Sequence, residues 1–187
     1  MSAVSTTSEQ AIAPVRAWIE RFVVDLNLCP FARPVVSSDA LRIVACESAS
    51  PEAIATLLIT ELDLLSQSAE ADIATSVLVF PEGLEEFDDY LGFLDDAQRV
   101  LEEMGLDGKI QIASFHPDYR FEGEPVDAVS HFTNRAPYPL IHLLRETMVS
   151  TVLENYPNPE RIPERNIQTL ERLGLASIER LLHSLDH

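Results

Sequence analysis

Residues 76–80, Ser-Val-Leu-Val-Phe, form an apolar run without polar alternation in a chain of 187 residues. Successive side chains of a β-strand point to opposite faces of a sheet, so a strand that is apolar on both sides is buried on both sides. Such a strand needs other elements packed above and below it. The run therefore predicts a central strand in a layered protein of helices and strands.

The flanking sequence supplies both kinds of element. Two further strands are predicted at 41–46 and 109–115. Helical spacing of apolar residues predicts helices over 10–26, 51–65 and from Gly83 to Met104, and Ser50 before Pro51 is a helix N-cap signal. We predict a further helix over 139–155 and two short helices separated at Gly174. Residues 118–134 are irregular, with room for one extra edge strand.

Strands that alternate with helices indicate an α/β fold. We predict a single domain with a small three- to four-stranded, mainly parallel or mixed sheet, flanking helices and a helical C-terminal part. An α+β arrangement with a mixed sheet is the alternative. Residues 1–9 are predicted to form a disordered tail and residues 10–187 the globular domain. If the sheet is parallel, Cys46, Glu82 and His116 follow their strands at one common edge.

Composition narrows the classes of function. The chain has 31 acidic and 13 basic residues and a net charge of −18. A strongly acidic chain is a poor binder of nucleic acids and of anionic membrane surfaces, so we expect neither as a partner. No apolar run is long enough to span a bilayer, and the first residues do not resemble a secretory signal. We therefore expect a cytoplasmic protein with two free thiols, while its oligomeric state stays open.

The stretch from Ser114 to Glu146 holds the highest density of chemically active side chains. His116 directly follows a predicted strand, where a histidine can serve as a general base. Within the predicted helix over 139–155, three polar side chains fall on one arc: His142, Arg145 and Glu146. They can form a cleft or a structural network of hydrogen bonds.

The residues before that helix are suited to binding. Asn134 and Arg135 lie in a proline-rich loop, where an amide and a guanidinium can grip a carboxylate or phosphate. Tyr138 adds a phenol beside them. Cys29, in the segment Cys-Pro-Phe-Ala, is a candidate nucleophile if the fold brings it near Arg135 or His116, and otherwise a small buried residue in a turn. No histidine or acidic spacing matches a known ligand pattern, so we expect neither a metal nor a cofactor.

Several segments together resemble a bacterial domain-of-unknown-function family labelled 1415. They are Trp18-Ile19, residues 26–32, Phe115-His116-Pro117, Tyr119 with Phe121, Asn134-Arg135 with residues 137–139, and His142 to Glu146. The resemblance implies a single-domain cytosolic bacterial protein and brings no activity, cofactor or catalytic residue with it.

Two functions fit these residues. In the first, the protein is a small enzyme that acts on an anionic small molecule: Arg135 and Arg145 bind the anion, and His116 or His142 transfers protons. Cys29 would be the nucleophile or redox group, and Tyr138 and Asn134 would position the substrate. In the second, the protein is a non-enzymatic binding or interaction module, and the polar cluster is an internal hydrogen-bond network.

Overall fold

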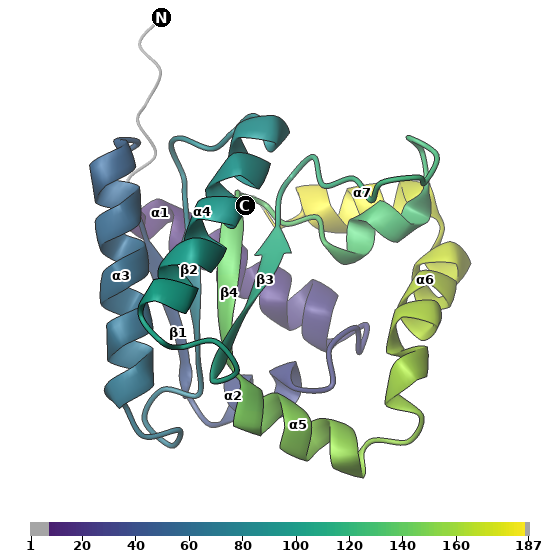
Figure 1. Ribbon diagram of the computed structural model, residues 1–187. Coiled ribbons are helices and arrows are strands. Elements are labelled where there is room, and N and C mark those ends of the chain that lie inside the picture. Colours follow the sequence, from purple (N-terminus) through teal and green to yellow (C-terminus); the bar gives the residue numbers. More distant parts are fainter. Residues whose placement is uncertain (1–7, 186–187) are drawn as a thin grey trace, which may run out of the picture.

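The computed structural model describes residues 8–185. Its centre is a four-stranded mixed sheet, flanked by helices on both faces (Figure 1). The strands are β1 (Leu41–Ala45), β2 (Thr75–Val79), β3 (Ile110–Phe115) and β4 (Leu140–Arg145). The α-helices are α1 (Ser8–Trp18), α2 (Ala32–Ser37), α3 (Pro51–Gln67), α4 (Phe87–Glu103), α5 (Glu146–Asn155), α6 (Ile162–Leu173) and α7 (Leu175–His183). The other turns are the π-helix η1 (Ile19–Val24) and the 3₁₀-helices η2 (Val129–Thr133) and η3 (Pro159–Arg161).

The strand order is β1-β2-β4-β3. β1 and β2 are parallel, and β4 lies between β2 and β3, antiparallel to both. β1, β2 and β3 therefore run in one direction, and their carboxyl ends meet at one edge, as predicted. This arrangement confirms the mixed-sheet form of the predicted fold.

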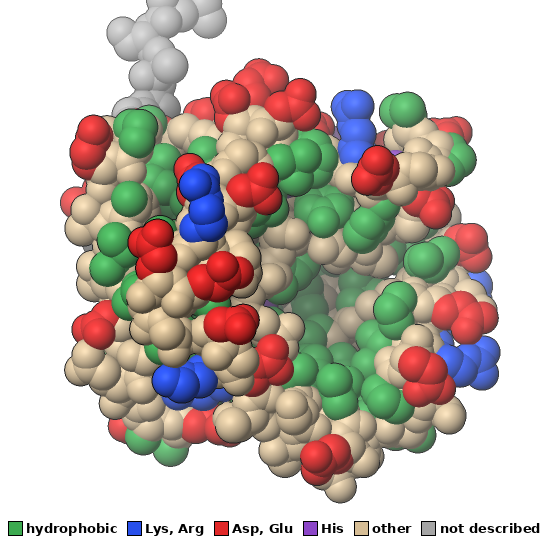
Figure 2. Space-filling view, viewed as in Figure 1, with side chains coloured by type: hydrophobic (Ala, Val, Ile, Leu, Met, Phe, Trp, Pro, Cys, Tyr) green, Lys and Arg blue, Asp and Glu red, His purple; other side chains and the backbone are tan. Residues whose placement is uncertain are grey.

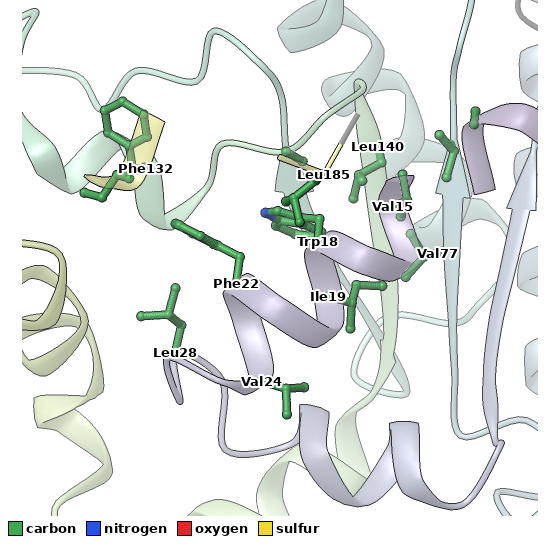
Figure 3. Packing of buried hydrophobic residues seen from close by; sticks show 14 of the residues in the cluster. Val15, Trp18, Ile19, Phe22, Val24, Leu28, Val77, Phe132, Leu140 and Leu185 are labelled. Atoms are coloured by element: carbon green, nitrogen blue, oxygen red, sulfur yellow. The ribbon is translucent and has the colours of Figure 1, made fainter. Parts of the chain in front are cut away.

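The two faces of the sheet belong to two hydrophobic clusters. Val77 and Val79 of β2 pack into the cluster formed with α1, η1, α6 and α7, and Figure 3 shows part of it around Trp18 and Phe22. Leu78 and Phe80 point the other way, into the cluster formed with α3 and α4. All five residues of β2 are buried, which confirms the prediction of a strand covered on both faces.

Several local signals act as predicted. The Ser50 hydroxyl accepts a hydrogen bond from the Ala53 amide and caps α3, and Pro51 is the first residue of that helix. Gly174 separates α6 from α7. The predicted helix over 10–26 is α1 continued by η1. It begins at Ser8, and residues 1–7 of the predicted tail lie outside the described residues.

One predicted element is wrong. The helix expected over 139–155 is two elements, the strand β4 and the helix α5, which begins at Glu146. Four of the six residues 140–145 are apolar, and a short run of that kind fits a buried helix and a buried strand equally well. In the structure this segment pairs with β2 on one side and β3 on the other, so it is a strand. This strand is the fourth of the sheet, and the segment 118–134 contains η2 but no strand.

Because residues 140–145 form a strand, three residues that the predicted helix would have placed on one arc lie apart. In a strand, side chains alternate between faces, so His142 and Arg145 point to opposite faces of the sheet. Glu146 belongs to α5. The predicted His142, Arg145 and Glu146 arc does not exist.

Candidate functional site

A cleft of about 540 Å³ opens between the end of β3 and helix α6. Figure 2 shows a hollow at this place, with walls made mostly of hydrophobic side chains. The cleft, a name kept below for this site, is lined by Val23, Leu28, Cys29, Phe115, Phe121, Glu122, Glu124, Ser130, Thr133, Asn134, Ile162, Pro163, Asn166 and Ile167. Its volume falls within the usual range of small-molecule sites.

The floor of the cleft is the turn that follows η1. Asn27 ends this helical segment with a φ of 54°, a left-handed conformation that asparagine adopts more readily than most residues. The turn is held from across the cleft, because the side-chain amide of Asn166 in α6 donates to the Leu28 carbonyl at 2.7 Å. This contact joins the two walls and sets where Cys29 lies.

A second, smaller cavity of about 70 Å³ lies behind the cleft, between the sheet and the segment from α1 to α2. This inner cavity is lined by Trp18, Ile19, Val23, Cys29, Phe31, Ala32, Val35, Val36, Leu41, Thr75, Val77, Phe115, Leu140, His142, Leu144 and Met148.

Cys29 lies at the boundary of the two spaces, since it lines both the cleft and the inner cavity. Burial raises the pKa of its thiol, while the backbone N–H groups of Phe31 and Ala32 lower the pKa in part. The sequence placed Cys29 after a helix and gave no sign of the short helix α2 that follows it. The net effect is a protonated thiol at neutral pH.

His142 is the other titratable group of the inner cavity. Its Nε2 lies 2.5 Å from the Thr75 hydroxyl, and that hydroxyl donates its one hydrogen to the Leu143 carbonyl. Nε2 of His142 must therefore carry the hydrogen, which leaves Nδ1 as an acceptor without a partner among the described residues. Burial lowers the pKa of His142 to about 4, so the imidazole is neutral at pH 7.

His116 does not reach either space. Its ring is fully buried beside Phe87 and Tyr90. Nδ1 accepts a hydrogen bond from the Asp118 amide at 3.0 Å, so Nε2 is the donor to the Leu84 carbonyl. Both ring nitrogens are thus engaged with the loops that follow β2 and β3.

His131 is bound in the same manner as His116. Its Nδ1 accepts from the Phe121 amide, and its Nε2 donates to the Pro125 carbonyl at 2.8 Å. The side chain is 1% exposed. Two of the three histidines of this stretch, His116 and His131, therefore use both ring nitrogens to hold backbone groups in place.

The predicted binding residues Asn134, Arg135 and Tyr138 lie in three different surroundings. Asn134 lines the cleft, but its side chain already donates to the Ser114 carbonyl and accepts from the Thr133 hydroxyl. Arg135 lies in a separate pocket beside Glu179, with its guanidinium 4.3 Å above the Phe132 ring. Burial lowers the pKa of Arg135. Tyr138 packs, half-buried, against the cluster around Trp18.

Arg145 and Glu146 lie at the far end of β4. The guanidinium of Arg145 donates to the carbonyls of Ile73 and Ser68 and so holds the connection between α3 and β2. The backbone amide of Glu146 donates to the Lys109 carbonyl. Neither residue lines the cleft or the inner cavity.

The structure therefore brings together Cys29 with His142 and Cys29 with Asn134, and it disperses the other candidates. Sequence reasoning missed the residues from η2 and α6 that complete the cleft, among them Ser130, Thr133 and Ile167. Their sequence pattern is that of ordinary turn and amphipathic-helix residues. Only the packing of α6 against η2, which buries Leu170 completely, makes them cleft residues.

Within residues 8–185, no three side chains of His, Cys, Asp or Glu come together as a metal site would require. None of the described helices combines the length and the apolar character needed to cross a membrane.

Comparison with known proteins gives one match. A model of a protein family described as "protein of unknown function (DUF1415)" matches residues 10–180. No curated protein and no solved structure matches the chain significantly.

Proposed function

The chain belongs to this DUF1415 family, whose function is unknown, and we propose that it binds a small, mostly apolar molecule in the cleft. The observation that carries the proposal is the cleft itself, which combines a volume of about 540 Å³ with walls of hydrophobic side chains from three separate parts of the chain. Apolar walls with a few polar groups are the usual composition of a ligand site.

The polar groups of the cleft indicate what kind of ligand fits. Among the described residues that line it, the charged side chains are Glu122 and Glu124, and there is no lysine or arginine. A carboxylate rim repels anions, in a chain whose net charge is already −18. The proposed ligand is therefore neutral or cationic, in contrast to the anion that the sequence suggested.

A binding role also agrees with the state of the other polar side chains. His116, His131 and Arg145 direct their nitrogens to backbone groups, and Asn134 is engaged with Ser114 and Thr133. These contacts stabilise loops and leave few groups for catalysis. They favour the non-enzymatic alternative over the enzyme acting on an anion.

The test is binding of 1-N-phenylnaphthylamine, a neutral apolar dye that fluoresces strongly in apolar surroundings. Ile167→Trp fills the cleft from α6 and should weaken dye binding at least tenfold. The matched control is Ile59→Trp, which places the same side chain on the exposed face of α3 and should leave binding unchanged. Equal binding by wild type and both folded variants would refute the cleft as the site.

A second candidate function is thiol chemistry at Cys29. It is favoured by one observation: His142, which lines the same cavity, has a free acceptor nitrogen. Because the pKa of His142 is about 4, its Nδ1 would accept a hydrogen bond from the thiol and orient it, and the thiol proton would pass to solvent as the sulfur attacks an electrophile. N-ethylmaleimide should then add to Cys29 about tenfold more slowly in His142→Gln than in wild type. Equal rates would exclude a role for His142.

A further inference from the structure

We propose that one ligand occupies both the cleft and the inner cavity, and that this ligand is an amphiphile with an unbranched alkyl tail. Its polar end lies in the cleft, and its tail passes Cys29 into the inner cavity. This inference rests on the proposed function and names the chemical class of the ligand.

The cleft and the inner cavity share part of their walls. Val23, Cys29 and Phe115 line both spaces, so the cleft and the inner cavity adjoin at these three side chains. Cys29 has the smallest side chain of the three and lies in the turn after η1, so we place the passage of a narrow, unbranched chain beside it.

The lining of the inner cavity is mostly apolar. Its polar groups are the Cys29 thiol, the Trp18 indole N–H, Nδ1 of His142 and the Thr75 hydroxyl, which is engaged with His142 and Leu143. A mostly apolar lining favours methylene groups.

The two spaces differ in charge. The charged side chains, Glu122 and Glu124, are in the cleft. The inner cavity has no charged side chain among its described lining residues. A ligand that matches both spaces is polar at one end and apolar at the other, with a neutral or cationic head.

The experiment is a series of straight-chain alcohols from 1-butanol to 1-dodecanol, measured by displacement of 1-N-phenylnaphthylamine. Each methylene that enters an apolar site should improve affinity about fourfold, until the inner cavity is full and the affinity becomes constant. Ala32→Leu fills the inner cavity from α2, so the affinity should become constant at a shorter chain length. Ala55→Leu, on the exposed face of α3, is the control and should behave like wild type.

Cys29 reports the position of the tail directly. At pH 9, a saturating long alcohol should slow alkylation of Cys29 by iodoacetamide at least tenfold. The inference is overturned if affinity does not rise with chain length, if Ala32→Leu matches wild type, or if long alcohols leave the alkylation rate unchanged. In each of these cases dye binding sensitive to Ile167→Trp still supports the proposed function. Failure of the dye and of every alcohol to bind overturns both.

Discussion

The Thr75 hydroxyl holds the His142 imidazole in one neutral form. The two residues lie on neighbouring strands, with 2.5 Å between Oγ1 and Nε2, and the hydroxyl hydrogen is directed at the Leu143 carbonyl. Protonation of His142 would place a positive charge beside an apolar cavity, where no described carboxylate faces it. This explains why burial lowers the pKa of His142 to about 4.

Acid should destabilise the fold through His142. In the unfolded chain its pKa is about 6.5, so between pH 6.5 and 4 the unfolded state binds a proton that the folded state does not. Above pH 6.5 this residue has no influence on the pH dependence of stability; at pH 4 its contribution reaches about 3 kcal/mol of lost stability. Urea unfolding between pH 6.5 and 4 gives the free energy of unfolding of wild type and of His142→Gln. The difference between the two curves isolates His142, because the carboxylates titrate in the same way in both proteins. Parallel curves would contradict the prediction.

Thr75→Val should destabilise the protein although valine has the same shape and favours strands. It leaves the Nε2 hydrogen of His142 without an acceptor, which costs about 2 kcal/mol. The matched variant Thr75→Ser keeps the hydroxyl and loses one methyl group, which costs about 1 kcal/mol. In chemical denaturation, wild type should be the most stable, Thr75→Ser less stable and Thr75→Val the least stable. The reverse order for the two variants would mean that packing outweighs the hydrogen bond.

His116 is expected to act as a structural residue. His116→Leu removes the partners of the Asp118 amide and the Leu84 carbonyl and should lower the free energy of unfolding by about 3 kcal/mol. In His116→Asn the side-chain oxygen can still accept from the Asp118 amide, so part of the loss should be recovered. Dye binding of both folded variants should match wild type. A binding defect without a loss of stability would instead give His116 a direct role.

Arg145 should stabilise the connection between α3 and β2. Arg145→Met keeps the aliphatic stem but removes the hydrogen bonds to Ile73 and Ser68, so we expect a loss of about 2 kcal/mol. Hydrogen exchange should speed up in residues 68–74. Arg145→Lys should recover only part of the stability, because an ammonium group lacks the planar fork that reaches both carbonyls. Unchanged exchange in Arg145→Met would show that the connection is held by other contacts.

Local signals in the sequence were sufficient for most elements of the fold. Ser50 before Pro51 marked the start of α3, and the unbroken apolar run marked β2 as the covered strand. The prediction failed at β4, because an apolar segment of six residues carries no periodicity that separates strand from helix. It also missed α2, whose six residues include a proline and no clear apolar stripe.

The candidate site was predicted less well than the fold. The density of histidines and arginines was visible in the sequence, but their hydrogen-bond partners were not. His116 and Arg145 are engaged with backbone carbonyls that lie 32 and 72 residues away along the chain, at Leu84 and Ile73. A sequence pattern reports which side chains are present, and it does not report which of them remain free.

The sequence by itself therefore determined the layered α/β character, the central strand and most helix ends, because these depend on contacts between near neighbours in the chain. The tertiary structure alone decided that β4 is a strand, that Cys29 and His142 line one cavity, and that α6 closes a cleft with Ile162 and Ile167. These features depend on surfaces that meet only after folding. Burial and pairing, rather than residue type, then select which polar groups are available to a ligand.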